Sequence, residues 1–204
     1  MKLQAAIDRV SIEDARHFVD LLDGKADVIE IGTSLIKDYG LENLTGLIRG
    51  RKSRMLGDLK TCDEGAYEFR RGFEAGFDIL TVMGSADDAT LDVCAETAEQ
   101  CGGTMMIDLL GCSDERVSHI ARYGDAIYCM HSPVDSETGI DLAGLVVEFK
   151  AEHPDYQTAA AGGISSDTIP RLKEAGLDLA VIGSGIIKAQ NPAEKLNAFI
   201  KELS

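Results

Sequence analysis

The sequence is dominated by short apolar runs that recur at nearly even intervals along its 204 residues. The runs are rich in Val, Ile, Leu and Met, and they lack the polar/apolar alternation of a strand with one face in water. Strands covered on both faces are typical of parallel sheets with crossover helices. We predict eight strands, at residues 3–7, 28–31, 54–59, 79–83, 104–109, 126–130, 157–161 and 179–182.

Segments with helical spacing lie between several of these runs. Apolar residues at i, i+3, i+4 and i+7 occur at 15–22, 91–98, 142–149 and 196–203. The last segment follows Asn191-Pro192-Ala193-Glu194, which has the N-cap residue, proline and glutamate of a helix start. Eight strand–helix units that close on themselves predict a (β/α)8 TIM barrel in a single domain over residues 1–204. At about 25 residues per unit, the connecting loops must be short.

An internal repeat supports this closure. Residues 74–85 and 174–184 resemble each other at an offset of 100 positions, which is about half the chain. Each copy has a Glu-Ala-Gly helix end, an Asp, an apolar run and a Gly-Ser pair. We interpret the fourth and eighth units as equivalent members of two half-barrels, although the common chemistry of helix–strand loops could give the same pattern.

Charge and composition exclude several classes of protein. The chain has 35 acidic against 20 basic residues, a net charge of −15, which repels nucleic acids and anionic lipids. No apolar run is long enough to cross a bilayer and no signal peptide is evident, so we expect a cytoplasmic protein. The five cysteines contain no CxxC pair, and we interpret them as reduced packing residues. The protein could still bind an anionic small substrate, provided that backbone dipoles or a metal ion reverse the electrostatic field at the binding site.

Polar residues collect at the C-terminal ends of the predicted strands. They are Asp8, Glu30, Asp58 with Lys60, Asp108 and His131. In a barrel of this type those ends converge on one pocket, where catalytic groups are found. A carboxylate within an apolar run is costly to bury unless it is paired or binds a metal. We therefore predict a catalytic site at this end, the alternative being that the acids individually cap loops and helices.

The densest of these features is Asp58-Leu59-Lys60-Thr61-Cys62-Asp63. Residues two apart on a strand project to the same side, so Asp58 and Lys60 share a face, and Asp63 falls in the following loop or first helical turn. A cation with two anions can hold a metal or stabilise a developing negative charge. The alternative is a plain salt bridge at the barrel mouth.

Two of the acids have the chemistry of a magnesium site. Glu30 and Asp58 offer the hard oxygen ligands that Mg²⁺ prefers, whereas the His and Cys residues show no zinc spacing. The two acids could equally accept hydrogen bonds from sugar hydroxyls. His131 is the only histidine that ends a predicted strand, and it could exchange a proton near neutral pH or serve a structural role.

Glycines follow the last two predicted strands. The sequences are Ala161-Gly162-Gly163-Ile164 and Gly183-Ser184-Gly185-Ile186. Glycine allows close approach to backbone amides, and barrel enzymes commonly grip phosphate in these two loops. We predict a phosphate site there, with tight turns as the alternative.

These residues resemble those of the 3-hexulose-6-phosphate synthase family, within the orotidine-monophosphate decarboxylase suprafamily, of which 3-keto-L-gulonate-6-phosphate decarboxylases are near relatives. The resemblance spans essentially the whole chain. It is carried by Met1-Lys2-Leu3-Gln4, Ala6-Ile7-Asp8, Glu30-Ile31-Gly32-Thr33, the 58–63 segment, residues 81–88, Met130-His131 and Ala161-Gly162-Gly163.

The resemblance implies a homodimer with active sites at the subunit interface, with Asp63 reaching into the partner's site. It implies Glu30 and Asp58 as Mg²⁺ ligands, Asp8 and Lys60 as groups that contact and stabilise an enediolate, and His131 as the residue that moves the proton. Asp108 matches an acidic position of the family.

The implied reaction is Mg²⁺-assisted condensation of formaldehyde with D-ribulose 5-phosphate. Ser132-Pro133 and Ser184-Gly185 stand where the decarboxylases tend to have arginines, which favours the synthase, although these residues also differ from typical synthases. Three alternatives stay open: decarboxylation of 3-keto-L-gulonate 6-phosphate through a similar enediolate, a phosphopentose epimerase, and a non-enzymatic sugar-phosphate sensor.

Overall fold

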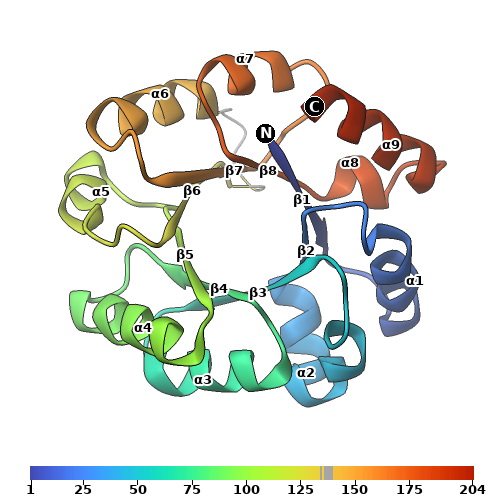
Figure 1. Cartoon of the computed structure of the whole chain (residues 1–204), viewed down its shortest axis with the longest axis horizontal. Coiled ribbons are helices and arrows are strands. Elements are labelled where there is room, and N and C mark those ends of the chain that lie inside the picture. The colour runs from blue at the N-terminus through green and yellow to red at the C-terminus, as the bar shows by residue number, and fades with distance from the viewer. Residues whose placement is uncertain (134, 136–139) are drawn as a thin grey trace.

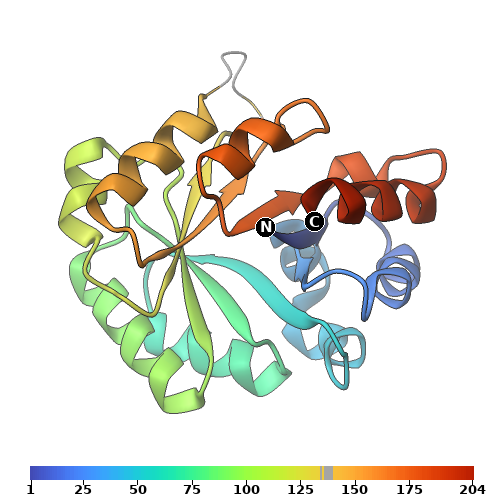
Figure 2. The ribbon, with the colours of Figure 1, turned by 45° about the horizontal axis from the view of Figure 1, so that its top comes forward.

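A computed structural model describes residues 1–133, 135 and 140–204, and in this part of the chain eight parallel strands close into a barrel (Figures 1 and 2). The strands pair in chain order, and β1 also pairs with β8 to close the ring. The TIM-barrel prediction is confirmed. The strands are β1 (Lys2–Ile7), β2 (Val28–Ile31), β3 (Arg54–Thr61), β4 (Ile79–Met83), β5 (Thr104–Asp108), β6 (Ile127–His131), β7 (Gln157–Ala161) and β8 (Leu179–Ile182).

Helices surround the barrel on the outside (Figure 1). They are α1 (Ile12–Leu22), α2 (Thr33–Ile48), α3 (Gly65–Ala75), α4 (Asp88–Cys101), α5 (Asp114–Ile120), α6 (Leu142–Glu152), α7 (Ile169–Glu174), α8 (Ser184–Ile187) and α9 (Pro192–Leu203). The four periodic segments fall in α1, α4, α6 and α9. Asn191 caps α9 as predicted, because its side-chain oxygen accepts a hydrogen bond from the Glu194 amide at 3.2 Å.

Three strand ends differ from the prediction. β3 continues to Thr61 through an irregularity, where the register with β4 shifts between Gly57 and Thr61 and Lys60 has a φ of +50°. β5 stops at Asp108, whose Oδ1 accepts a hydrogen bond from the Leu110 amide at 3.0 Å and turns the chain. β6 is displaced by one residue and ends at His131.

The barrel interior is packed with apolar side chains rather than open. Val28, Leu56, Ile79, Met106 and Ile127 belong to this inner cluster. Each lies two residues before a polar or cysteine side chain on the same strand, so the inward face of each strand changes from apolar to reactive toward its end. A second, larger core fills the space between the barrel and the helices. The packing confines the site to one end of the barrel.

The helix–strand junctions in the two copies of the repeat have similar backbone geometry. In each, the glycine adopts a positive φ, +114° at Gly76 and +80° at Gly176. The amide of the next residue bonds back to the helix, from Phe77 to the Gly72 carbonyl and from Leu177 to the Leu172 carbonyl. Because Gly102 and Gly103 end α4 in the same way, with a φ of +68° at Gly102 and a hydrogen bond from the Gly103 amide to the Ala98 carbonyl, this shared geometry does not separate the two interpretations, and the equivalence of the fourth and eighth units stays a prediction.

An aspartate precedes each of β2, β4 and β8 and ties that strand to its neighbour. Asp27 accepts a hydrogen bond from the Leu3 amide at 2.9 Å, and Asp78 accepts one from the Met55 amide at 2.7 Å. Asp178 accepts one from the Thr158 amide at 2.8 Å. We call Asp27, Asp78 and Asp178 the strand-start aspartates. They lie at the end of the barrel where the strands begin, opposite to the strand ends that carry the polar residues.

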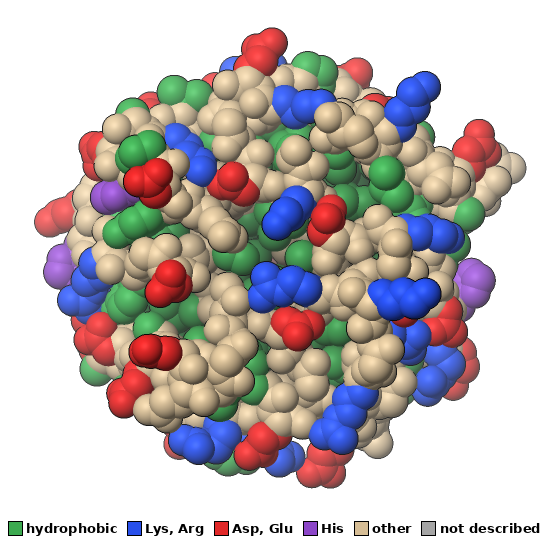
Figure 3. All heavy atoms as spheres, viewed as in Figure 1, with side chains coloured by type: hydrophobic (Ala, Val, Ile, Leu, Met, Phe, Trp, Pro, Cys, Tyr) green, Lys and Arg blue, Asp and Glu red, His purple; other side chains and the backbone are tan. Residues whose placement is uncertain are grey.

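Two of the five cysteines are not the packing residues that we predicted. Cys94 and Cys129 are buried, as packing residues should be, but Cys62 and Cys101 are exposed, because neither faces a core. Figure 3 shows acidic and basic side chains interspersed over the visible face, without a large patch of one sign. No helix in the described part of the chain is long and apolar enough to span a membrane.

Candidate active site

A cavity of about 980 Å³ opens at the end of the barrel where the strands terminate. Its lining contains every site residue predicted from the sequence except Asp63. These are Asp8, Glu30, Asp58, Lys60, Asp108, His131, Gly162, Gly163, Gly183, Ser184 and Gly185. Thr81 of β4 lines the cavity as well, so residues from all eight units meet in one place, as the barrel topology requires.

Asp108, at the end of β5, connects the cation and the imidazole of the site. Its Oδ2 lies 2.6 Å from the Lys60 ammonium, and both of its oxygens lie 3.0 Å from His131 Nδ1. Lys60 also lies 3.3 Å from Asp58 Oδ2. The irregular backbone at Lys60 does not remove its side chain from the cavity. A continuous chain of charged groups therefore runs from Asp58 through Lys60 and Asp108 to His131.

Lys60 and Asp108 hold each other in their charged forms. Burial alone would lower the pKa of Lys60, but the Asp58 and Asp108 carboxylates outweigh it and raise that pKa above its ordinary value. Burial alone would raise the pKa of Asp108, but the His131 hydrogen bond and the Lys60 charge outweigh it and lower that pKa. Lys60 is therefore suited to stabilise negative charge rather than to accept a proton.

Two threonines fix the Asp58 carboxylate. Thr33, the first residue of α2, donates to Asp58 Oδ2 at 2.6 Å, and Thr81 on β4 donates to Oδ1 at 2.8 Å. The Thr81 hydroxyl also accepts from the Lys60 amide at 2.9 Å. We predicted no role for either threonine from the sequence. The sequence did contain a signal for Thr81, because it lies two residues after the inward-facing Ile79 on the same strand and therefore faces the same side.

Glu30 is the second carboxylate beside Asp58. Burial and then repulsion from Asp58 raise its pKa to about 8, although a hydrogen bond from Gln4 Nε2 to Glu30 Oε2, at 2.6 Å, opposes this shift. Two carboxylates in one low-dielectric pocket repel each other unless a cation compensates them. The arrangement therefore favours a positively charged ligand between or beside them.

The donor set fits magnesium. In the described residues no group of three or more His, Cys, Asp or Glu side chains is arranged to enclose a metal. A pair of carboxylates suits Mg²⁺, which binds through one or two carboxylates and fills its remaining positions with water and substrate oxygens. Zinc would require more nitrogen or sulfur ligands. Glu30 and Asp58 are the residues that would hold the ion.

Asp8 directly follows β1 and is oriented by the start of α2. Its Oδ1 accepts a hydrogen bond from the Ser34 amide at 3.2 Å and another from the Ser34 hydroxyl. Gly32 makes room for it, because a Cβ at this position would lie 2.7 Å from Asp8 Cγ. Three cations that we did not single out from the sequence, Arg9, Lys37 and Lys188, also line the cavity.

The glycine pair after β7 provides tight backbone geometry. Gly162 has a φ of +98°, and a Cβ there would lie 2.3 Å from the Ser132 carbonyl oxygen. Gly163 has a φ of +69° with open space around it. The tight-turn requirement is therefore met at these two positions. Their role toward phosphate stays a prediction, which their place in the cavity lining favours.

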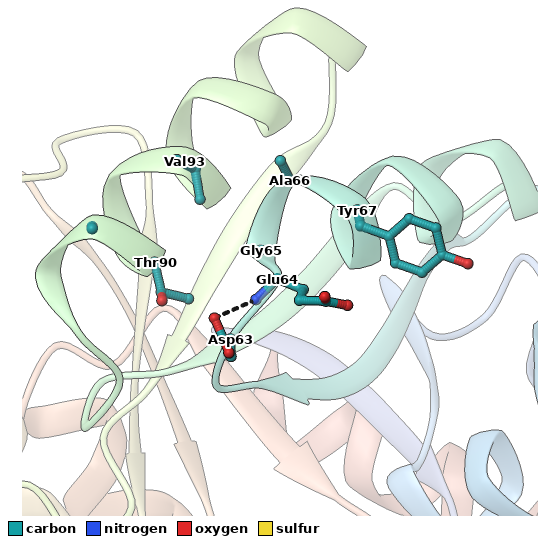
Figure 4. Close-up of a pocket in the computed structure, with 8 residues that line it drawn as sticks. Asp63, Glu64, Gly65, Ala66, Tyr67, Thr90 and Val93 are labelled. Carbon is teal, nitrogen blue, oxygen red and sulfur yellow. Dashed lines mark hydrogen bonds between the residues drawn. The ribbon is translucent and has the colours of Figure 1, made fainter.

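Asp63 lies apart from this cavity. It lines a separate surface pocket of about 690 Å³ between the starts of α3 and α4, where its Oδ1 accepts a hydrogen bond from the Glu64 amide at 2.8 Å (Figure 4). The chain leaves the barrel after Thr61. The expected cluster of Asp58, Lys60 and Asp63 therefore does not form within one chain. The role that the resemblance implies for Asp63, in a partner's site, stays a prediction.

Comparison with known proteins gives concordant matches. The orotidine 5'-phosphate decarboxylase / HUMPS family matches residues 1–199. A 3-hexulose-6-phosphate synthase of Mycobacterium gastri is 35% identical over 198 residues, which cover 95% of each chain. One of Bacillus subtilis (strain 168) is 33% identical over 198 residues, covering 95% of this chain and 94% of the relative. A crystal structure of a 3-hexulose-6-phosphate synthase superposes with a TM-score of 0.91 at 33% identity, covering 100% of both chains.

Proposed function

Because the chain belongs to the orotidine 5'-phosphate decarboxylase / HUMPS family, we propose that it catalyses the Mg²⁺-dependent aldol condensation of formaldehyde with D-ribulose 5-phosphate. The product is D-arabino-3-hexulose 6-phosphate. The similarity to two proteins named 3-hexulose-6-phosphate synthase supports the substrates. The observation that carries the chemistry is the contact of Asp108 with both Lys60 and His131, beside the Glu30 and Asp58 carboxylates.

The first step is removal of a proton from C1 of the sugar, which leaves a 1,2-enediolate. His131 is the base in this proposal. Asp108 faces Nδ1 at 3.0 Å, so Nδ1 carries the proton that bonds the carboxylate and Nε2 is left to accept the proton from carbon. Asp108 stays an anion and stabilises the imidazolium that forms.

Lys60 stabilises the negative charge that develops on the sugar oxygens. Its raised pKa keeps it cationic throughout the reaction, and its burial strengthens its electrostatic effect. Asp8 contacts the hydroxyl groups of the same intermediate. Glu30 and Asp58 would hold Mg²⁺, which would supply Lewis-acid stabilisation of the developing negative charge.

The second step forms the carbon–carbon bond. C1 of the enediolate attacks the carbonyl carbon of formaldehyde, the C2 oxygen becomes a ketone, and the formaldehyde oxygen takes a proton from the His131 imidazolium. All atoms of both substrates are retained, and His131 returns to its neutral state. The reverse sequence is an aldol cleavage.

In this proposal, the phosphate group of the sugar binds at the loops after β7 and β8. The loops at Gly162–Gly163 and Gly183–Gly185 present backbone amides, and Lys188, one helical turn beyond Ser184, adds a cation to an otherwise acidic molecule. We also propose a homodimer in which Asp63 approaches the partner's site. Tyr67 and Val93, which are 64% and 37% exposed beside Asp63, provide apolar surface for that contact.

The direct test mixes the purified protein with ribulose 5-phosphate, formaldehyde and Mg²⁺ and follows the loss of formaldehyde. We expect consumption that stops when EDTA is added. Lys60→Met should abolish it, and Lys52→Met, which changes an exposed lysine outside the cavity, should not. Release of CO₂ from 3-keto-L-gulonate 6-phosphate, without formaldehyde consumption, would identify a decarboxylase instead. Tight sugar-phosphate binding without turnover under any divalent metal would identify a sensor.

A further inference from the structure

Gln4 is a buried amide that lines the cavity from β1 and is only 1% exposed. Its two polar atoms have different environments. Nε2 donates to Glu30 Oε2 at 2.6 Å, whereas Oε1 is buried without a hydrogen-bond partner among the described residues. An acceptor that loses its water without gaining a donor destabilises the folded state. The fold therefore tolerates an unfavourable group at this position.

The opposite orientation of the amide would not remove the penalty. Rotating the amide by half a turn would place Oε1 next to Glu30 Oε2, so that two acceptors would repel each other at hydrogen-bonding distance whenever Glu30 is ionised, as a metal ligand must be. The contact with the ionised Glu30 carboxylate therefore dictates which way the amide faces. An apolar side chain of similar size would avoid the unpaired oxygen altogether.

Glu30 depends on this one contact. Asp58 receives hydrogen bonds from the hydroxyls of Thr33 and Thr81, whereas Gln4 is the only side chain in the described part of the chain that donates to Glu30. The two carboxylates of the site thus have separate supporting groups, and the one for Glu30 comes at a cost in stability.

We propose that Gln4 is a positioning residue, which holds the Glu30 carboxylate in the orientation that a divalent cation needs at the expense of fold stability. The inference rests on the proposed metal site. It goes further by assigning the orientation of one ligand to a residue that itself need not touch the ion. Removing the hydrogen-bond partner of a metal ligand typically lowers metal affinity by about tenfold to hundredfold.

The consequence is that affinity and stability should change in opposite directions when Gln4 is replaced by Met. Gln4→Met fills a similar volume but lacks both the donor and the unpaired acceptor. We expect Mn²⁺ affinity to fall by about tenfold or more, while the melting temperature of the metal-free protein stays equal or rises. A residue that only packed the barrel would lower the melting temperature and leave the affinity unchanged.

The experiment titrates Mn²⁺ into the full chain without substrate, with free Mn²⁺ followed by electron paramagnetic resonance, and measures thermal melts of the metal-free proteins. Gln157→Met, at the exposed start of β7, is the matched control and should bind Mn²⁺ like the unchanged protein. Glu30→Gln reports on the metal site itself. If Glu30→Gln retains normal Mn²⁺ binding, the proposed metal site is wrong.

If Glu30→Gln loses Mn²⁺ binding while Gln4→Met retains it, the metal site stands and the role of Gln4 is overturned. A Gln4→Met protein that melts at a lower temperature than the unchanged protein also overturns the inference, because the amide would then stabilise the fold.

Discussion

Replacing Asp108 with Asn tests the charged chain at the centre of the site. The change keeps the shape of the side chain and removes the charge that lies 2.6 Å from the Lys60 ammonium. The Asp108 side chain is only 5% exposed, so the pair is poorly screened by water. Removing one partner of a buried ion pair costs about 3–5 kcal/mol. Since Asp58 stays 3.3 Å from Lys60, we expect the lower end of that range, about 3 kcal/mol.

The expected change is large enough to measure by thermal denaturation. For a domain of this size each kcal/mol moves the melting temperature by about 2–4 °C, so Asp108→Asn should lower it by about 6–12 °C near neutral pH. Asp92→Asn, which breaks an exposed pair with Arg122 on the outer surface, is the matched control and should change the melting temperature little.

The same difference should depend on pH with a defined sign. The pKa of Asp108 lies below its ordinary value, so its stabilising effect is complete above the unfolded-state pKa of about 3.9 and is lost as the pH falls through the folded-state value. The gap between the unchanged protein and Asp108→Asn should therefore narrow below about pH 4. Equal melting temperatures near neutral pH, or a gap that widens in acid, would refute the reasoning.

Three further outcomes follow from particular side chains. Asp58→Ala should abolish Mg²⁺-dependent formaldehyde consumption, and a near-normal rate with metal dependence intact would overturn the ligand assignment. In chemical denaturation, Gly163→Ala should lower the free energy of unfolding by about 1–2 kcal/mol, because the position has a positive φ. Gly162→Ala should lower it further, because the added Cβ would also clash with the Ser132 carbonyl. Equal losses in the two variants would contradict this. Iodoacetamide near pH 8 should label exposed Cys101 in minutes but spare Cys94, where burial and then Glu68 raise the pKa to about 12, as peptide mass spectrometry would show.

The sequence allowed the barrel and most of the site to be predicted because both follow from a period of two along each strand. Leu56 and Asp58 share one inward face, as do Met106 and Asp108, so an apolar run that ends in an acid marks a strand whose end faces the cavity. Asp63 could not be placed in the same way. The backbone at Lys60 has a positive φ, which is rare for lysine and has no signature in residue type.

Several helices showed no recognised periodic pattern, for physical reasons that differ from case to case. α2 contains Gly40 with a φ of +72° inside it, which interrupts the helical periodicity. α5, α7 and α8 have 7, 6 and 4 residues, too few for a periodic pattern to be recognised. The contact between Gln4 and Glu30 depends on strand register, because the pairing of Ala6 with Glu30 brings β1 beside the carboxylate. The register between two strands depends on both of them and cannot be predicted from the sequence of either one alone.

The strand-start aspartates fasten neighbouring strands in pairs at the end of the barrel that holds none of the reactive groups. The anchoring of the framework and the chemistry are thus in separate places. Loops around the reactive mouth can be randomised in a laboratory library without disturbing Asp27, Asp78 or Asp178, so this chain is a suitable starting point for directed evolution toward aldehydes larger than the formaldehyde of the proposed reaction.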